Sequence, residues 1–449
     1  MNLIYNVKDK PKFGQLIVFA FQQLLAILAA TIAVPAIIGN GMSQAAALFG
    51  AGVGTIVYLL FTKFKSPVFL GSSFAFLGSM AAAFTGAVTM EGGYAGLLIG
   101  AVSAGLVYVV IAIVVKIAGV KWIGKLMPPV VIGPTVAIIG LSLAGNAVKD
   151  AVGCSAGFVN YDAAGSMYAM TAKGWIALAC ALVTLFTVML CSVFGKKMAK
   201  MIPFVIGICA GYVLATIFTL IGSATGNETL QIIDFSAFKS MQWVPDFTFI
   251  KAIKGFADID GKYIATVIVA YVPVAFVVFA EHIADHKNLS SIIGTELLED
   301  PGLHRTLLGD GVGSIAGAFF GGCPNTTYGE SVGCVAISGN ASCITILTTA
   351  ILAIVASFVA PLTTLLATIP SCVMGGVCIS LYGFIAVSGL KMLQPVDLGD
   401  NRNLFTASVI LIIGIGGLTV SFGKVTITTV ACALILGILT NFLLRGKKK

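Results

Sequence analysis

The sequence predicts an all-α, polytopic membrane protein with about 14 transmembrane segments, arranged as two inverted repeats of seven. Three observations predict this fold: the composition, the series of apolar runs, and landmarks that recur half a chain apart. Hydrophobic residues make up 58% of the 449 residues and charged residues only 10%. The mean hydropathy is +1.03. A soluble protein of this length could not cover its surface with so few charges.

The apolar runs are bounded by charges, Gly or Pro, and most are long enough to cross a bilayer. The third and tenth runs are weak, because they are short and rich in Gly, Ser and Thr (LGSSFAFLGS and GGCPNTTYGESVG). Irregular backbone at membrane depth must be covered by protein or line a cavity. Short interrupted segments at matching positions of two halves also indicate a binding site. We therefore expect GSSF (71–74) and TTYGE (326–330) to face each other across such a site.

Proline landmarks indicate an internal repeat. Three pairs recur at nearly one period, each seven segments further along the chain: Pro35 and Pro273, Pro67 and Pro324, Pro128 and Pro370. Because seven is odd, the second half must enter the membrane from the opposite side, which is typical of secondary transporters. The alternative is that Pro and Gly simply recur in any polytopic chain. The predicted divisions are residues 1–222 (first repeat), 223–262 (an extracellular or periplasmic connection) and 263–449 (second repeat).

The distribution of positive charge predicts the orientation. Most of the 26 Lys and Arg residues fall in the termini and the even-numbered loops. By the positive-inside rule both termini are cytoplasmic, in a multi-pass protein of the plasma or inner membrane. The net charge of +8 is expected to lie beside anionic lipid of the bilayer, and no nucleic-acid partner is predicted.

The stretch EHIADHKNL (281–289) is the densest group of ionisable residues next to an apolar run. Glu281, Asp285 and Asn288 follow the spacing i, i+4, i+7 and share one helix face. Glu330 is the one charge between Cys323 and Leu390, and an ionisable group inside a span is a functional candidate by default. The alternative is that the cluster marks the cytoplasmic end of the eighth span, because the 18 residues before it almost cross a bilayer.

The remaining polar features predict no metal or cofactor. His282 and His286 also stand four apart, but no third metal ligand with convincing spacing follows, and the ten cysteines form no CxxC pair. We expect Asp310 to join His304 and Arg305 in an ion network at the membrane interface.

Five stretches carry a resemblance that covers residues 12 to 440: YLLFTKFKSPVFLGSSFAF, VVFAEHIADHKNL, DPGLHRTLLGDG, PNTTYGESVG and IPSCVMGGVCISLYG. In these stretches the sequence resembles the nucleobase–ascorbate transporter family, and within it the bacterial uracil permeases. The resemblance implies fourteen spans in two inverted sets. Spans 1–4 and 8–11 would form a core, and spans 5–7 and 12–14 a gate through which members form homodimers. It also implies short antiparallel strands in the third and tenth spans.

The resemblance further implies the site residues. Contact with the bound base is assigned to two carboxylates, two backbone amides and one wall residue: Glu281 and Glu330, Phe74 and Gly329, and Ala30. Proton coupling is assigned to Asp285, one turn after Glu281, together with Glu281 itself. Two positions depart from the family pattern: Ser331 stands where uracil permeases usually have Asn, and Cys323 replaces a Ser- or Thr-like residue.

The chemistry of uracil suits these residues. Its two N–H groups can donate to carboxylates, its two carbonyls can accept from backbone amides, and Phe74 and Tyr328 could pack on the ring. We therefore expect a proton-coupled uracil symporter that works by alternating access, and not an enzyme. The alternatives are a purine symporter (for xanthine or urate), sodium-coupled nucleobase uptake, and, from a different class, a channel. A membrane enzyme would need a nucleophile–base or metal set, and all three histidines lie between residues 282 and 304.

Overall fold

The computed structural model describes residues 3–153, 158–160, 168–196, 198–422 and 425–444. Most of these residues are helical, and the chain divides into two compact units. Unit 1 comprises Met1–Ser142, Pro245–Phe358 and Ile385–Lys449, and unit 2 comprises Leu143–Val244 and Val359–Phe384.

Unit 1 contains most of the elements, and they are mainly long helices. They are α1 (Phe13–Ile38), α2 (Gln44–Phe61), β1 (Leu70–Ser72), η1 (Phe74–Phe76), α3 (Leu77–Gly86), α4 (Met90–Ala118), α5 (Lys121–Leu126), α6 (Pro129–Ser142), α11 (Thr248–Gly255), α12 (Gly261–Ile293), η5 (Leu298–Gly302), α13 (Leu303–Gly321), β4 (Asn325–Thr327), α14 (Gly329–Ser338), α15 (Cys343–Ser357), α18 (Asn401–Ile415), β5 (Val420–Phe422), β6 (Val425–Ile427) and α19 (Thr429–Leu443).

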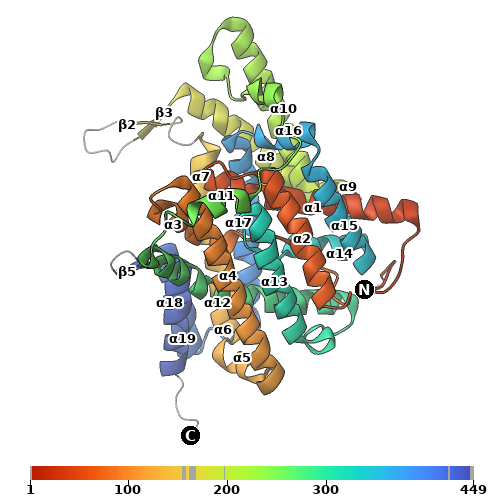
Figure 1. Ribbon diagram of the computed structural model, residues 1–449, viewed down its shortest axis with the longest axis vertical. Helices are drawn as coiled ribbons and strands as arrows, with labels where there is room; N and C mark the ends of the chain where they lie inside the picture. The colour runs from red at the N-terminus through yellow and green to blue at the C-terminus, as the bar shows by residue number, and fades with distance from the viewer. Residues whose placement is uncertain (1–2, 154–157, 161–167, 197, 423–424, 445–449) are drawn as a thin grey trace. The chain divides into compact units, whose positions relative to one another are not determined.

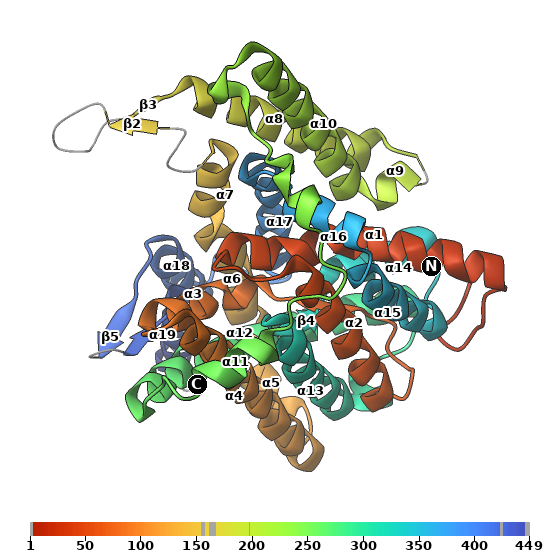
Figure 2. The same cartoon turned by 45° about the horizontal axis from the view of Figure 1, so that its top comes forward.

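Unit 2 is built around one helix pair. Its elements are α7 (Ala144–Ala151), β2 (Phe158–Asn160), β3 (Tyr168–Met170), α8 (Ala172–Phe194), α9 (Met198–Met201), α10 (Pro203–Thr225), η3 (Glu228–Leu230), η4 (Phe235–Ser240) and α16 (Ala360–Ala367). Helices α8 and α10 pack side by side (Figure 2), and glycine permits the close approach. A Cβ on Gly211 would lie 1.9 Å from Oγ1 of Thr184. Helix α17 (Ser371–Lys391) contributes residues to both units.

Eight of the described helices are long and apolar enough to cross a membrane, or nine if α15 and α16 form one broken span. Shorter apolar helices cover Phe74–Gly86, Asn401–Ile415 and Thr429–Leu443. The chain is therefore a multi-pass membrane protein, mostly helical, as its composition predicts.

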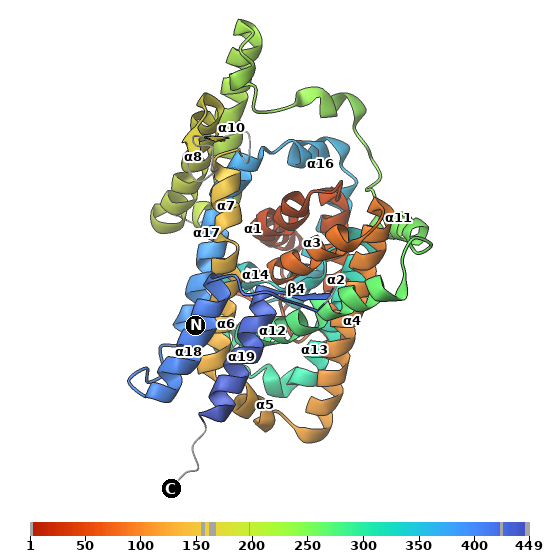
Figure 3. The same cartoon turned by 90° about the vertical axis from the view of Figure 1, so that its left-hand side faces the viewer.

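The centre of unit 1 is a set of helices joined through glycine. Helix α13 packs against α2 and α4 (Figure 1). A Cβ on Gly50 would lie 2.3 Å from the carbonyl oxygen of Gly317, and one on Gly54 would lie 2.7 Å from that of Gly313. Small residues let helix backbones approach this closely in a membrane, where lipid tails supply no hydrophobic drive for association. A second group in unit 1, α6, α18 and α19, packs together beside it (Figure 3).

Two short strands lie among these helices. Strands β1 and β4 pair antiparallel, with Leu70 opposite Thr327 and Ser72 opposite Asn325. Backbone hydrogen bonds continue the ladder at both ends, from Ser73 N to Pro324 O and from Tyr328 N to Phe69 O. The side chain of Asn325 donates to the carbonyl of Gly50 at 3.1 Å. Two segments more than 250 residues apart in sequence are thereby fixed to each other and to α2.

The N-terminal segment fixes the far end of α14. Ile4 N donates to the carbonyl of Gly339, and Ala341 N and Cys343 N donate to the carbonyls of Tyr5 and Val7. Val7 also packs against a buried apolar cluster that includes α14 residues. The segment thus joins the end of α14 to the start of α15.

Candidate functional site

The charged stretch at 281–289 lies inside one continuous helix. Helix α12 begins after Asp260, whose side chain accepts from Tyr263 N at 2.7 Å, and ends at Gly294 in the left-handed conformation. The helix continues through the stretch to Ile293, so these residues lie within α12; the alternative that they mark the cytoplasmic end of the span stays a prediction. Its ionisable residues are held inside unit 1 rather than released into a loop.

The helix presents two different polar faces. Glu281 and Asp285 are partly exposed on one face, whereas His282 and His286 are buried at 0% and 1% exposure on another. Partial exposure deep in a helical core is what a side chain needs in order to meet a ligand. The spacing that placed Glu281 and Asp285 on a common face is confirmed by the helix itself.

The carboxylate face of α12 meets the junction of β4 and α14. Thr327 Oγ1 donates to Oδ2 of Asp285 at 2.8 Å. A Cβ built on Gly329 would meet Oδ1 of Asp285 at 3.8 Å, an ordinary contact. Glu330 follows and is partly exposed. The structure therefore brings the predicted residues of the eighth and tenth segments together.

The three carboxyl groups of Glu281, Asp285 and Glu330 are close enough to interact electrostatically. They come from two helices, and each leaves part of its surface accessible. Three acceptors gathered at one place favour a ligand that carries N–H or O–H donors.

The start of α14 supplies donors beside these acceptors. Its first helical hydrogen bond runs from Val332 N to Tyr328 O, so by helix geometry the N–H groups of Gly329 and Glu330 precede the bonded ladder. The positive end of the helix dipole lies here as well. Phe74 is the first residue of the corresponding short helix η1, one residue after the end of β1, and is 7% exposed.

Tyr328 and Ala30 occupy buried positions next to the strands. The Tyr328 hydroxyl donates to the carbonyl of Ser72 at 2.8 Å, and a Cβ on Gly71 would lie 2.3 Å from its ring. Gly71 therefore leaves the space that this ring fills. Ala30 is 1% exposed on α1, the helix that packs against β1 and α14.

Ser331 has a structural role that the sequence did not reveal. Its Oγ accepts from Phe69 N at 3.0 Å and from the amide of Gln23 on α1. The side chain is 0% exposed. The serine at this position therefore links α14 to α1 and to the residue before β1. Cys323, the second departure, is 1% exposed just before β4.

The predicted interfacial network around Asp310 is wrong. Asp310 is 0% exposed and its Oδ2 lies 2.7 Å from Nδ1 of His282, whereas Arg305 donates to the carbonyl of Phe61. The overlooked signal is that Asp310 stands between two glycines in the otherwise uncharged run LLGDGVG. Among the described residues, no group of three or more His, Cys, Asp or Glu side chains is placed to hold a metal ion.

Comparison with known proteins identifies relatives over almost the whole chain. Residues 14–422 match the sequence signature of the Permease family. The uracil permease of Bacillus caldolyticus is 39% identical over 449 residues, covering 99% of this chain and 95% of that protein. The uracil permease of Bacillus subtilis is 37% identical, with coverage of 99% and 96%. That of Escherichia coli K12 is 33% identical, with coverage of 96% and 92%.

Two solved structures share the fold at low sequence identity. The transmembrane domain of the cyanobacterial bicarbonate transporter BicA superposes with a TM-score of 0.60 at 15% identity, covering 97% of this chain and 98% of that one. The murine anion transporter Slc26a9 gives 0.66 at 12% identity, covering 97% and 69%. Signature and relatives agree: the chain belongs to the permease family of nucleobase–ascorbate transporters, and it is a transporter and not an enzyme.

Proposed function

We propose that this permease imports uracil by proton symport through alternating access. The relatives named above are uracil permeases at 33% identity or more, and each aligns with nearly the full length of this chain. The observation that supports the proposal is that the α12 carboxylates meet the first turn of α14, so that hydrogen-bond acceptors and donors lie close together.

The hydrogen-bonding pattern of uracil matches this arrangement. In this proposal Glu281 and Glu330 accept from its two N–H groups, and the N–H of Gly329 donates to a carbonyl. Phe74 supplies the second backbone donor from the start of η1. Rings that lack these groups would leave buried polar atoms unpaired and would bind much more weakly. Ala30 and Tyr328 form the walls beside the ring.

Proton coupling follows from the same cluster. Repulsion among Glu281, Asp285 and Glu330 is relieved when one of them takes up a proton. We assign the coupling role to Asp285, together with Glu281 one turn before it. Asp285 already accepts a hydrogen bond from Thr327 of β4. A change in the charge of Asp285 would therefore alter a contact with the segment that carries Glu330.

The architecture completes the proposal. Both halves contain a strand followed by a helix, β1 with η1 and α3 in one and β4 with α14 in the other, which supports inverted repeats over residues 1–222 and 263–449. We infer fourteen spans, with a core of spans 1–4 and 8–11 and a gate of spans 5–7 and 12–14. The gate would join two copies into a homodimer. The protein would lie in the inner or plasma membrane, with both termini cytoplasmic.

Calorimetry on the purified protein tests the substrate. Wild type should bind uracil and should bind xanthine weakly or not at all. Glu281→Ala should abolish the uracil signal, and Glu281→Gln should weaken it severely because the amide presents a donor to a donor. Glu91, an acidic residue in the first turn of α4, serves as the control, since Glu91→Gln should bind as wild type does. Tight xanthine binding, or uracil binding by Glu281→Ala at wild-type strength, would overturn the proposal.

A further inference from the structure

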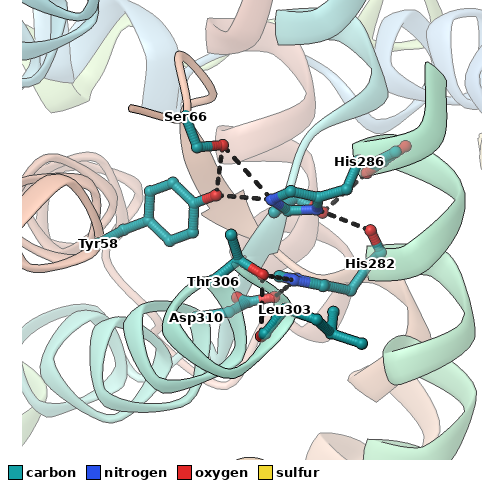
Figure 4. A network of polar contacts seen from close by, with 9 residues as sticks. Tyr58, Ser66, His282, His286, Leu303, Thr306 and Asp310 are labelled. Atoms are coloured by element: carbon teal, nitrogen blue, oxygen red, sulfur yellow. Dashed lines mark hydrogen bonds and ion pairs between the residues drawn. The ribbon is translucent and has the colours of Figure 1, made fainter. Parts of the chain in front are cut away.

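Behind the carboxylate face of α12 lies a second cluster of titratable side chains that the proposed transport site does not use (Figure 4). The rings of His282 and His286 are stacked with centroids 4.0 Å apart. Nδ1 of His282 lies 2.7 Å from Oδ2 of Asp310, and both side chains are 0% exposed. Because burying a charge is costly, the position of each proton in this pair decides whether the pair is charged or neutral.

The hydrogen bonds of Thr306 favour one tautomer of His282. The Thr306 hydroxyl donates its single hydrogen to the carbonyl of Leu303 at 3.1 Å. Its oxygen therefore accepts from Nε2 of His282, which is 2.9 Å away. Nε2 carries a proton, and the contact between Nδ1 and Asp310 must contain another, because two lone pairs would repel each other at 2.7 Å.

The second oxygen of Asp310 shows where that other proton resides. Oδ1 is buried and receives no hydrogen bond from the described part of the chain. An ionised carboxylate is costly to bury unless both oxygens are paired, whereas a neutral acid needs only one acceptor for its proton. Among the ion pairs of the described residues, Asp310 takes part in one, and its partner there is His282. The proton therefore lies on Oδ2 of Asp310 and is donated to Nδ1 of His282.

The surroundings also favour a neutral Asp310. The titratable groups that face the pair come from three helices: Tyr58 of α2, Tyr108 of α4, and Glu281, Asp285 and His286 of α12. On α13 itself, Arg305 is turned to the carbonyl of Phe61. An ionised Asp310 would repel both carboxylates on the ligand side of α12. Loss of its proton would therefore add a charge where the cluster is already acidic.

The pair also controls the direction in which α12 presents its carboxylates. His282 follows Glu281 directly, and its ring is held by Thr306 and Asp310, which stand one turn apart on α13. Rotation of α12 against α13 would break both hydrogen bonds. His286 adds a third tie, to the Tyr58 hydroxyl of α2 at 2.7 Å.

We propose that Asp310 keeps its proton throughout the transport cycle and, with His282, acts as a positioning pair that fixes the rotation of α12 and the direction of Glu281. The transported proton is carried on the other face of the helix. Asp310 is thus a positioning residue and not a coupling residue. The tests of this proposal by uracil binding and uptake rest on the proposed function, whereas its test by melting temperature does not.

Two substitutions of Asp310 separate the role of its shape from the role of its charge. In Asp310→Asn the side-chain amide can donate to Nδ1 of His282, as the protonated acid does. We expect this variant to keep uracil affinity within about twofold of wild type and to retain uptake driven by a pH gradient with an unchanged pH profile. Asp310→Ala removes the donor, and uptake should fall by about tenfold or more. The melting temperature should be close to wild type for the Asn variant and lower for the Ala variant.

Each contrary outcome overturns a defined part of this inference. An Asn variant that binds and exchanges uracil but no longer accumulates it against a pH gradient would mean that the Asp310 proton is the transported one. An Asn variant with wild-type stability that binds as weakly as the Ala variant would mean that the carboxylate charge is needed. An Ala variant equal to wild type would remove the positioning role. Should the Ala variant fail to fold, the Asn variant alone decides. Wild-type vesicles that take up no uracil would contradict the proposed function instead, and the order of melting temperatures would still test the pair.

Discussion

Gly329→Ala tests the ligand site with little cost to the fold. A Cβ at this position would meet only Oδ1 of Asp285 at 3.8 Å, so the methyl group fits the protein without rearrangement. Gly329 is the first residue of α14 and is not among the residues with a positive φ, so alanine can adopt its backbone conformation. The fold should therefore be as stable as wild type or slightly more stable. Any loss of uracil affinity would therefore come from contact between the methyl group and the ligand, and not from a change in the fold.

The magnitude follows from what the methyl group would displace. If the base approaches the N–H of Gly329, the substitution loses a hydrogen bond of about 0.5–1.5 kcal/mol and adds steric overlap of about 1–3 kcal/mol. The sum corresponds to a loss of roughly tenfold to a thousandfold in uracil affinity. Gly329→Val, with a branched side chain, should be worse still.

A matched control stands one turn along the same helix. A Cβ on Gly333 would meet nothing within 4 Å, so Gly333→Ala makes the same chemical change one turn further from the start of α14. Both variants should melt at or slightly above the wild-type temperature, and only Gly329→Ala should lose affinity in calorimetry. Wild-type affinity in a folded Gly329→Ala protein would refute a backbone contact here.

Three further substitutions test other parts of the account. Asp285→Asn should keep some uracil binding and counterflow but lose accumulation driven by a pH gradient in proteoliposomes; wild-type accumulation would move the coupling role to Glu281. Glu330→Ala should weaken uracil binding by one to two decades, from the loss of a charge-assisted hydrogen bond of about 1.5–3 kcal/mol, and unchanged affinity in calorimetry would remove the tenth segment from the site. Gly50→Ala would place a methyl 2.3 Å from the carbonyl of Gly317, so overpacking should lower stability by about 1–3 kcal/mol, seen as a lower melting temperature, and an unchanged value would contradict the close packing of α2 on α13.

Local patterns in the sequence were enough to find the carboxylate face. Hydropathy marks the apolar helices, and helical periodicity puts Glu281 and Asp285 on one side of α12. Both signals depend only on residues within a few turns of each other. The charge of Glu330 stood out for the same reason, because its own segment contains no other charge.

The partners across helices could not be predicted in this way. Asp310 bonds to His282, and Ser331 bonds to Gln23 and to the backbone of Phe69, because helices α1, α12 and α13 pack at particular rotations. Those rotations are set by glycine contacts and hydrogen bonds between segments far apart in the chain. The closeness of Asp310 to His304 and Arg305 in sequence therefore suggested an interfacial network, whereas the fold buries Asp310.

The central claim is that the carboxylate face of α12 and the start of α14 form a uracil site coupled to protons. Uptake of labelled uracil into proteoliposomes, with proton and sodium gradients imposed separately, tests it most directly. We predict saturable accumulation when the outside is acidic, no stimulation by sodium alone, and no accumulation by Glu281→Ala vesicles. Non-saturable uptake that ignores both gradients, or accumulation driven by sodium and indifferent to pH, would contradict the account.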